Sequence, residues 1–215
     1  MKKQAAGVTI VLVVSGADRE LPRGLAAQLH AGDELLWADG LEELETVLRH
    51  SPGRFILLAE ACDAWHPSRR EACITALSKG AMAAVHDAVV VDGDMNEVAG
   101  SLLRGMRIGP LRRRFCPPYM GCCMALRREV LDRALPFPKK VTAPDFWLGA
   151  MAARLGRVAY LERALMFHRS TRTGLGRGRL FGTLPSCCRA LGLRLLAWRR
   201  VRGHAFNGGN FSGSP

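Results

Sequence analysis

The sequence contains no uninterrupted apolar run approaching the ~20 residues that a membrane-spanning helix requires. Hydrophobic residues make up 48% and charged residues 23% of its 215 positions, a balance typical of globular proteins rather than of disordered or fibrous chains. A chain of this length can bury one sizeable core but not comfortably two. We therefore expect one globular domain without a membrane span.

The cysteine spacings of a zinc finger or a redox dithiol are also absent. The chain has no C-x-x-C, and its histidines do not fall at zinc-finger spacing. The seven cysteines are Cys62, Cys73, Cys116, Cys122, Cys123, Cys187 and Cys188. Their odd number and irregular spacing favour free thiols in a reducing compartment, which predicts a cytoplasmic protein. We interpret Cys122 and Cys123 as packing residues, because no neighbouring charge pattern would activate a thiolate.

Acidic residues are missing from the last quarter of the chain. None follows Glu162, whereas ten arginines do, and the remaining 21 basic and 19 acidic side chains nearly balance in residues 1–162. Most of the net charge of +12 therefore lies in the C-terminal tail. Such a tail attracts phosphate-bearing partners: an anionic membrane surface, a nucleic acid or a sugar diphosphate.

The tail divides into a basic arm, residues 171–205, and a Gly/Ser/Asn-rich end, residues 206–215, which we expect to be disordered. Residues 173–179 lack the spacing and the lysine of a phosphate-binding loop and predict a flexible cationic linker. Leucines and a tryptophan among the arginines of residues 187–201 favour a helix at an anionic membrane surface. Nucleic acid is the weaker candidate, because the tail has few aromatic residues and no recognisable nucleic-acid-binding module.

The N-terminus allows two interpretations. Lys2 and Lys3 followed by the apolar residues 5–14 could form a short signal peptide. Residues 8–14 are also dense in β-branched side chains, as central parallel strands are. We favour the strand, because free cysteines fit the cytosol.

Short apolar segments alternate with helix-like segments along the chain. The expected strands are residues 8–14, 34–37, 55–59, 83–91, 122–126 and 158–161. The expected helices are residues 19–30, 41–50, 67–79, 127–134 and 145–155. This alternation predicts an α/β fold with a mostly parallel sheet flanked by helices.

Acidic residues follow two of these strands. Asp39 comes after the strand 34–37, and Glu60 and Asp63 come after the strand 55–59. Ligands of open α/β sheets bind outside the carboxyl ends of the strands, where carboxylates can contact a ribose or hold a divalent metal. From spacing alone, a turn at Asp39 and a helix cap at Asp63 explain the same residues.

Four later segments resemble family 2 glycosyltransferases, in particular their rhamnosyltransferase-like branch. Residues 60–67 (EACDAWHP) are similar to the family's acidic metal-binding motif, in which a Trp and then a Pro follow the aspartates. Residues 121–128 (GCCMALRR) resemble its acceptor-side strand and helix. Residues 144–147 (PDFW) resemble its His-Asp-Trp-Trp motif, and residues 157–169 its last strand and basic motif.

The resemblance implies a GT-A-like domain over residues 1–170 and transfer of a sugar from a nucleotide-sugar donor, with inversion, to a glycan or lipid-linked acceptor. Asp145 is then the general base that deprotonates the acceptor hydroxyl. Asp63 with Glu60 would hold Mg²⁺ or Mn²⁺, and Asp39 and Arg169 would contact the nucleotide. Envelope polysaccharide synthesis at the inner face of the membrane is the corresponding role.

The chain departs from the family pattern at specific positions. Glu60 and Cys62 stand where the family has aspartates, Pro144 replaces a histidine, and the N-terminal half is short. A thiol is a poor ligand for Mg²⁺. The departures support a second hypothesis, an inactive relative that binds or scaffolds at the membrane surface. A nucleic-acid binder that works through its basic tail is the third hypothesis.

Overall fold

The computed structural model describes residues 7–14, 19–102, 119–139, 141, 143–169 and 192–201, apart from the side chain of Leu41. The basic loop near residue 113 and most of the predicted basic arm lie outside these ranges. The strands are β1 (Val8–Val14), β2 (Glu34–Asp39), β3 (Phe55–Glu60), β4 (Ala64–Trp65), β5 (Ala83–Val91), β6 (Glu97–Ala99), β7 (Met124–Arg127) and β8 (Val158–Arg169). The α-helices are α1 (Gly40–His50), α2 (Arg69–Ser78), α4 (Arg128–Ala134) and α5 (Pro144–Leu155), with short 3-10 turns η1 (Ala26–Gln28) and η2 (Gly121–Cys123).

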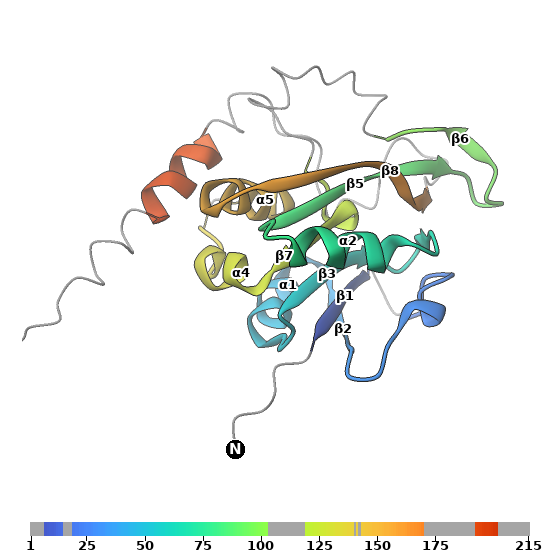
Figure 1. The fold of residues 1–215 in the computed structure, drawn as a ribbon, viewed down its shortest axis with the longest axis horizontal. Coiled ribbons are helices and arrows are strands. Elements are labelled where there is room, and N and C mark those ends of the chain that lie inside the picture. Colours follow the sequence, from blue (N-terminus) through green and yellow to red (C-terminus); the bar gives the residue numbers. More distant parts are fainter. Residues whose placement is uncertain are drawn as a thin grey trace, which may run out of the picture.

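The strands form one sheet in the order β2-β1-β3-β7-β5-β8-β4, with β6 paired to β5 (Figure 1). β1 runs parallel to β2 and β3, and β5 runs parallel to β8. β7 lies between β3 and β5 and runs antiparallel to both. The prediction of a mostly parallel sheet is therefore wrong: the sheet is mixed.

Successive side chains of a strand point to opposite faces, so the hydrophobic core is divided between the two faces of the sheet. Val11 and Val13 of β1 pack with α1, α4 and α5, whereas Ile10 and Leu12 pack with α2 on the other face. Both faces of β1 are buried, as its high content of β-branched residues predicts. The prediction of a buried first strand at residues 8–14 is confirmed.

Most other predicted elements lie where the sequence places them, with three exceptions. The strand expected at residues 122–126 begins only at Met124, because Cys122 and Cys123 belong to the turn η2. The helix expected at residues 19–30 is only the 3-10 turn η1, because Pro22 and Gly24 interrupt the segment and Gly24 has φ +80°. The strand expected at 158–161 continues to Arg169, since β8 pairs with β5 over its whole length. This extension lets the last part of β8 pair with β4 as well.

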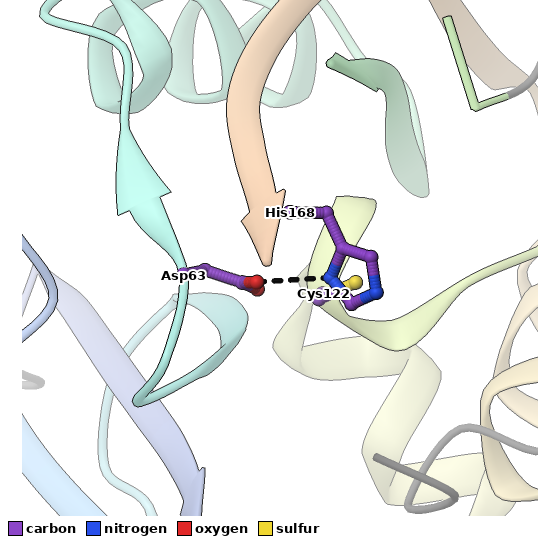
Figure 2. Close-up of side chains that lie close together, drawn as sticks. All are labelled: Asp63, Cys122 and His168. Carbon is purple, nitrogen blue, oxygen red and sulfur yellow. Dashed lines mark hydrogen bonds and ion pairs between the residues drawn. The ribbon is translucent and has the colours of Figure 1, made fainter. Parts of the chain in front are cut away.

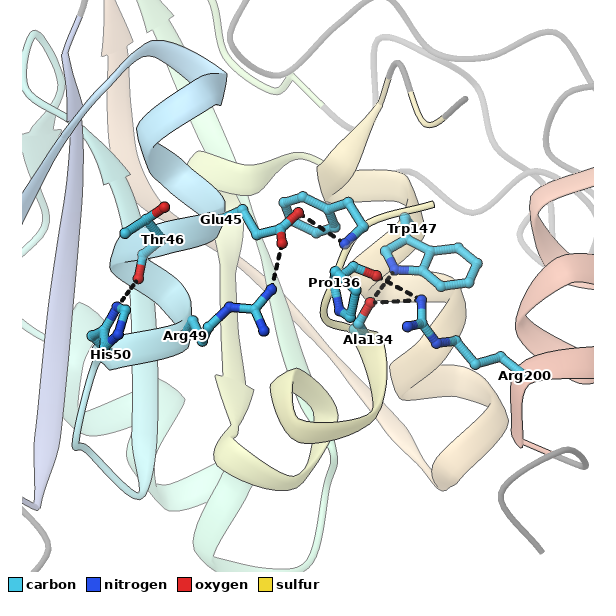
Figure 3. A network of polar contacts seen from close by, with 9 residues as sticks. Glu45, Thr46, Arg49, His50, Ala134, Pro136, Trp147 and Arg200 are labelled. Carbon is cyan, nitrogen blue, oxygen red and sulfur yellow. Dashed lines mark hydrogen bonds and ion pairs between the residues drawn. The ribbon is translucent and has the colours of Figure 1, made fainter. Parts of the chain in front are cut away.

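A further helix, residues 192–201, packs against α4 and α5 (Figure 3). Ala197 is buried, and Arg200 donates hydrogen bonds to the carbonyl oxygens of Ala134 (3.2 Å) and Pro136 (2.6 Å). The indole N–H of Trp147 donates to the same Ala134 oxygen at 3.0 Å. Within the described ranges, no helix combines the length and apolarity needed to cross a bilayer.

Candidate functional site

The loop after β3 turns two carboxylates into the protein. β3 ends at Glu60, and the N–H of Asp63 donates to the Glu60 carbonyl oxygen at 3.2 Å before β4 begins. The side chains of Glu60 and Asp63 are buried, whereas Cys62 between them is exposed. The acidic motif therefore faces the interior at the carboxyl end of the parallel strands.

The pairing of β4 with β8 brings His168 to this loop. Ala64 lies opposite Phe167, so His168 reaches Asp63, and its Nδ1 lies 2.9 Å from Asp63 Oδ1 (Figure 2). Burial alone would lower the pKa of His168, but the hydrogen bond to Asp63 and the neighbouring Cys122 raise it to about 11. His168 is therefore an imidazolium that forms an ion pair with Asp63, most of which is shielded from water.

The third member of this cluster is Cys122, from η2. Its sulfur, a carboxylate oxygen of Asp63 and a ring nitrogen of His168 all lie within 4.8 Å of one another. A hydrogen bond with Cys123 and burial raise the pKa of Cys122 well above its usual value, so the group is a thiol. The other oxygen of Asp63, Oδ2, is buried and has no hydrogen-bond partner among the described residues.

Glu60 and Asp145 add two buried carboxyl groups. Burial, and then the charge of Asp63, raise the pKa of Glu60 to about 8, and Asp145 contributes to the same shift. Burial raises the pKa of Asp145 to about 7, although its hydrogen bond from the Phe146 N–H (2.7 Å) opposes the rise. Asp145 is not the N-cap of α5, which is Ala143, but lies in the first turn.

Arg69 lies behind the cluster and is completely buried. Its Nη2 donates to the carbonyl oxygens of Leu58 and Cys122, each at 2.7 Å, and its Nε donates to His86 Nε2 at 3.0 Å. The guanidinium carbon lies 3.9 Å from the ring centroid of Trp65. Arg69 thus ties together β3, η2 and β5, the elements that hold the site.

The other predicted site residues lie at the margin. Asp39 is opposite Val14 in the register and Glu60 is opposite Val13, so both are at one edge of the sheet. Two strand spacings, ~10 Å, separate them. Arg169 ends β8 next to His168 and is exposed. The structure brings Glu60, Asp63 and Asp145 into one buried group, and it leaves Asp39 and Arg169 outside.

Sequence reasoning missed Cys122, His168, Arg69 and His86 as partners of this group. His168 lies inside the basic motif at the end of the domain, but the nucleotide contact of that motif was assigned from the sequence to Arg169. Successive residues of a strand point to opposite faces, so only one of the two can reach Asp63. The alternation of side chains along a strand was therefore the sequence signal that could have pointed to His168. The sequence contains no comparable signal for Arg69, whose partners are carbonyl oxygens.

The donor atoms do not fit the hard cation that the family resemblance implies. Besides the first cluster, Glu60, Cys62 and Asp63 form a second group of ligand atoms within 4.8 Å of one another. Both groups include a cysteine sulfur, whereas Mg²⁺ and Mn²⁺ prefer carboxylate, carbonyl and water oxygens. A thiol and an imidazole beside a carboxylate suit a softer divalent metal.

Comparison with known proteins shows similarity at the level of fold. No family model and no curated protein matches the chain. Residues 1–349 of TarS from S. aureus in complex with UDP-GlcNAc match with a TM-score of 0.54 and 13% identity, over 91% of this chain and 66% of that one. The UDP complex matches with a TM-score of 0.55 and 12% identity, over 90% and 71%.

A further structure of TarS 1–349 matches with a TM-score of 0.54 and 13% identity, over 76% of this chain and 60% of that one. In two of these three matches, this chain spans only 60% and 66% of the TarS structure, which is less than two thirds of its length. The mixed sheet with helices on both faces is the GT-A architecture of these structures. The chain therefore has a GT-A fold.

Proposed function

We propose that this protein transfers a sugar from a nucleotide-sugar donor to a glycan or lipid-linked acceptor, with inversion at the anomeric carbon. One observation carries the proposal: in a GT-A fold, the buried Glu60 and Asp63 lie at the carboxyl end of β3, and the buried Asp145 of α5 is near enough to contribute to the pKa shift of Glu60. TarS, which shares this fold, has been crystallised with UDP-GlcNAc. UDP-GlcNAc is therefore the first donor to test.

Asp145 is the proposed general base. Its carboxylate accepts the proton of the acceptor hydroxyl as that oxygen attacks the anomeric carbon, and the bond from this carbon to the nucleoside diphosphate breaks. A base works best when its pKa lies near the operating pH, and burial raises the pKa of Asp145 to about 7. The hydrogen bond from the Phe146 N–H holds the carboxylate in place at the start of α5.

The nucleotide would lie along the edge formed by β2, β1 and β3. Asp39 at the end of β2 is placed to accept hydrogen bonds from a ribose, and the exposed Arg169 at the end of β8 is placed to attract the diphosphate. A lipid-linked acceptor requires access to a membrane face. The helix 192–201 supports such attachment, because Leu195 and Leu196 are 61% and 42% exposed among its arginines.

The test uses the full chain and UDP-GlcNAc, with release of UDP as the measure of turnover. We expect Asp145→Asn to lower turnover by at least ~100-fold without weakening UDP binding measured by calorimetry. The matched control is Asp132→Asn, because Asp132 is an exposed carboxylate on α4. Equal turnover in the wild type and Asp145→Asn would exclude the base assigned here.

A second candidate is a relative that binds the nucleotide sugar without transferring it. Cys62 within the acidic motif and the closed ion pair of Asp63 with His168 favour it. Tight UDP binding by a wild-type chain that turns over no donor would identify this case. Salt-sensitive binding to RNA or DNA, lost when residues 171–215 are removed, would instead support the nucleic-acid hypothesis.

A further inference from the structure

We propose that Asp63, Cys122 and His168 form a binding site for a thiophilic divalent metal ion of the Zn²⁺ class. The proposal concerns the same edge of the sheet as the proposed transfer, but it does not depend on catalysis. A metal-binding measurement can support it even if the chain transfers no sugar.

The three ligand atoms come from separate parts of the chain and already lie close together. Asp63 follows β3, Cys122 belongs to η2 and His168 lies near the end of β8, yet their ligand atoms are all within 4.8 Å (Figure 2). Tetrahedral zinc bonds of about 2.0–2.3 Å separate two ligands by roughly 3.3–3.8 Å. Small side-chain rotations are therefore sufficient to close the site around an ion.

An unsatisfied oxygen points to a missing partner. The Asp63 side chain is 0% exposed, and its Oδ2 has no hydrogen-bond partner among the described residues. Buried polar atoms in native proteins nearly always have a partner. A metal bound to the carboxylate would supply one, and it would displace the proton that His168 Nδ1 shares with Asp63 Oδ1.

The chemistry of the ligands selects the metal. Thiolate, imidazole and carboxylate are the ligands of zinc sites, whereas Mg²⁺ requires oxygen ligands. A metal ion lowers the pKa of a coordinating thiol and deprotonates it on binding. The guanidinium of Arg69, which interacts with the charges of Asp63 and Cys122, offsets the negative charge of the two ligands.

The surrounding structure orients the cysteine ligand. The carbonyl oxygen of Cys122 accepts a 2.7 Å hydrogen bond from Arg69, which holds η2 against β3. Three protein ligands leave a tetrahedral ion one open position, as in catalytic zinc sites. His168 is the most exposed of the three ligands, at 12% of its side chain.

Co²⁺ titration of the whole 215-residue chain, reduced and stripped of metal, tests the proposal directly. Co²⁺ bound to a thiolate produces a charge-transfer band that an all-oxygen site cannot produce. We expect one equivalent of Co²⁺ to give this band, Zn²⁺ to abolish it by displacement, and millimolar Mg²⁺ to leave it unchanged. Cys116, Cys187 and Cys188, outside the described residues, are replaced together by serine in the parent protein to remove other thiol sites.

Matched variants then identify the sulfur ligand. Cys122→Ser should abolish the band and weaken Zn²⁺ binding by at least about 100-fold, whereas Cys62→Ser, next to Asp63, should change neither. Loss of the band in Cys62→Ser but not in Cys122→Ser would overturn the proposal in favour of the loop cluster. His168→Gln provides an independent test, because His168 is the least buried ligand. Unchanged Zn²⁺ affinity in this variant would also overturn the proposal.

Discussion

Two histidines on adjacent strands, His86 of β5 and His168 of β8, differ in charge: His86 is neutral and His168 is a cation. His86 is fully buried and accepts a hydrogen bond from Arg69 at 3.0 Å, while its other nitrogen lies 2.8 Å from the Asp87 carbonyl oxygen. Burial and the charge of Arg69 lower its pKa to about 3. His168, also shielded, has its pKa raised to about 11 by Asp63 and Cys122 despite the opposing effect of burial.

Burial lowers the pKa of both histidines, and their neighbours make the difference: Asp63 and Cys122 outweigh burial at His168, whereas the charge of Arg69 adds to it at His86. Burial and the guanidinium keep His86 neutral, so it serves as an acceptor that supports Arg69 and hence the framework of the site. A carboxylate keeps His168 protonated in the absence of metal, at the edge where ligands bind. Breaking either pair should therefore affect a different property: stability for Arg69 and His86, and charge at the site for Asp63 and His168.

The largest expected effect is loss of the framework in Arg69→Met. The substitution leaves the carbonyl oxygens of Leu58 and Cys122 without their donor in a buried environment. Hydrogen bonds to charged groups contribute about 1.5–3 kcal/mol each, so we expect the free energy of unfolding to fall by about 3–5 kcal/mol. Urea denaturation followed by circular dichroism measures it.

Arg163→Met is the control for this prediction. Arg163 is exposed on β8 and makes a single 3.3 Å hydrogen bond to Ser68. Its replacement should change the free energy of unfolding by no more than about 0.5 kcal/mol. A loss of less than about 1 kcal/mol in Arg69→Met would mean that the desolvation of the guanidinium cancels its hydrogen bonds.

The next prediction separates the two histidines by pH. His86 has a lowered pKa, so its contribution to stability is present above pH 6.5 and is lost as the pH falls toward about 3. His168 has a raised pKa, so its contribution is present below pH 6.5 and is lost as the pH rises toward about 11. In a chelating buffer, His86→Gln should flatten the acid side of the stability profile, and His168→Gln the alkaline side.

Carboxyl groups of the site contribute to the alkaline side as well. The pKa values of Glu60 and Asp145 are raised to about 8 and about 7, so both favour the folded state less as the pH rises through these values. The wild type should therefore be less stable at pH 9 than at pH 6. Identical alkaline profiles for the wild type and His168→Gln would show that the ion pair with Asp63 does not hold the proton.

Much of the fold was predictable from local patterns. The buried strand at residues 8–14 and the strand at 83–91 follow from short, valine-containing apolar segments, and α1 and α5 begin and end within a residue of their predicted bounds. The antiparallel direction of β7 was not predictable, because no local pattern records which neighbours a strand of four residues will have. The short β4 pairs with β8 for the same non-local reason.

The candidate site divides in the same way, into positions that local patterns predict and partners that they do not. Asp63, in the loop after a predicted strand, and Asp145, at the start of a predicted helix, indicated a candidate site in advance. Their partners depend on contacts between distant segments: Asp63 and His168 are 105 positions apart, and Cys122 reaches them only through the turn η2. Cysteine spacing, which argued against a zinc finger, carries no information about ligands gathered from three separate elements.

The smallest effect tests how the ring beneath Arg69 contributes to the framework. Trp65 and Trp147 are both buried and each lies under an arginine, but Trp147 Nε1 donates to Ala134 at 3.0 Å, whereas Trp65 Nε1 has no partner among the described residues. Phenylalanine keeps a ring for the arginine and removes the N–H. Trp147→Phe loses a buried hydrogen bond and should therefore cost about 1–2 kcal/mol more unfolding free energy than Trp65→Phe. Equal losses by urea denaturation would mean that ring volume, and not the indole N–H, decides the contribution to stability at both positions.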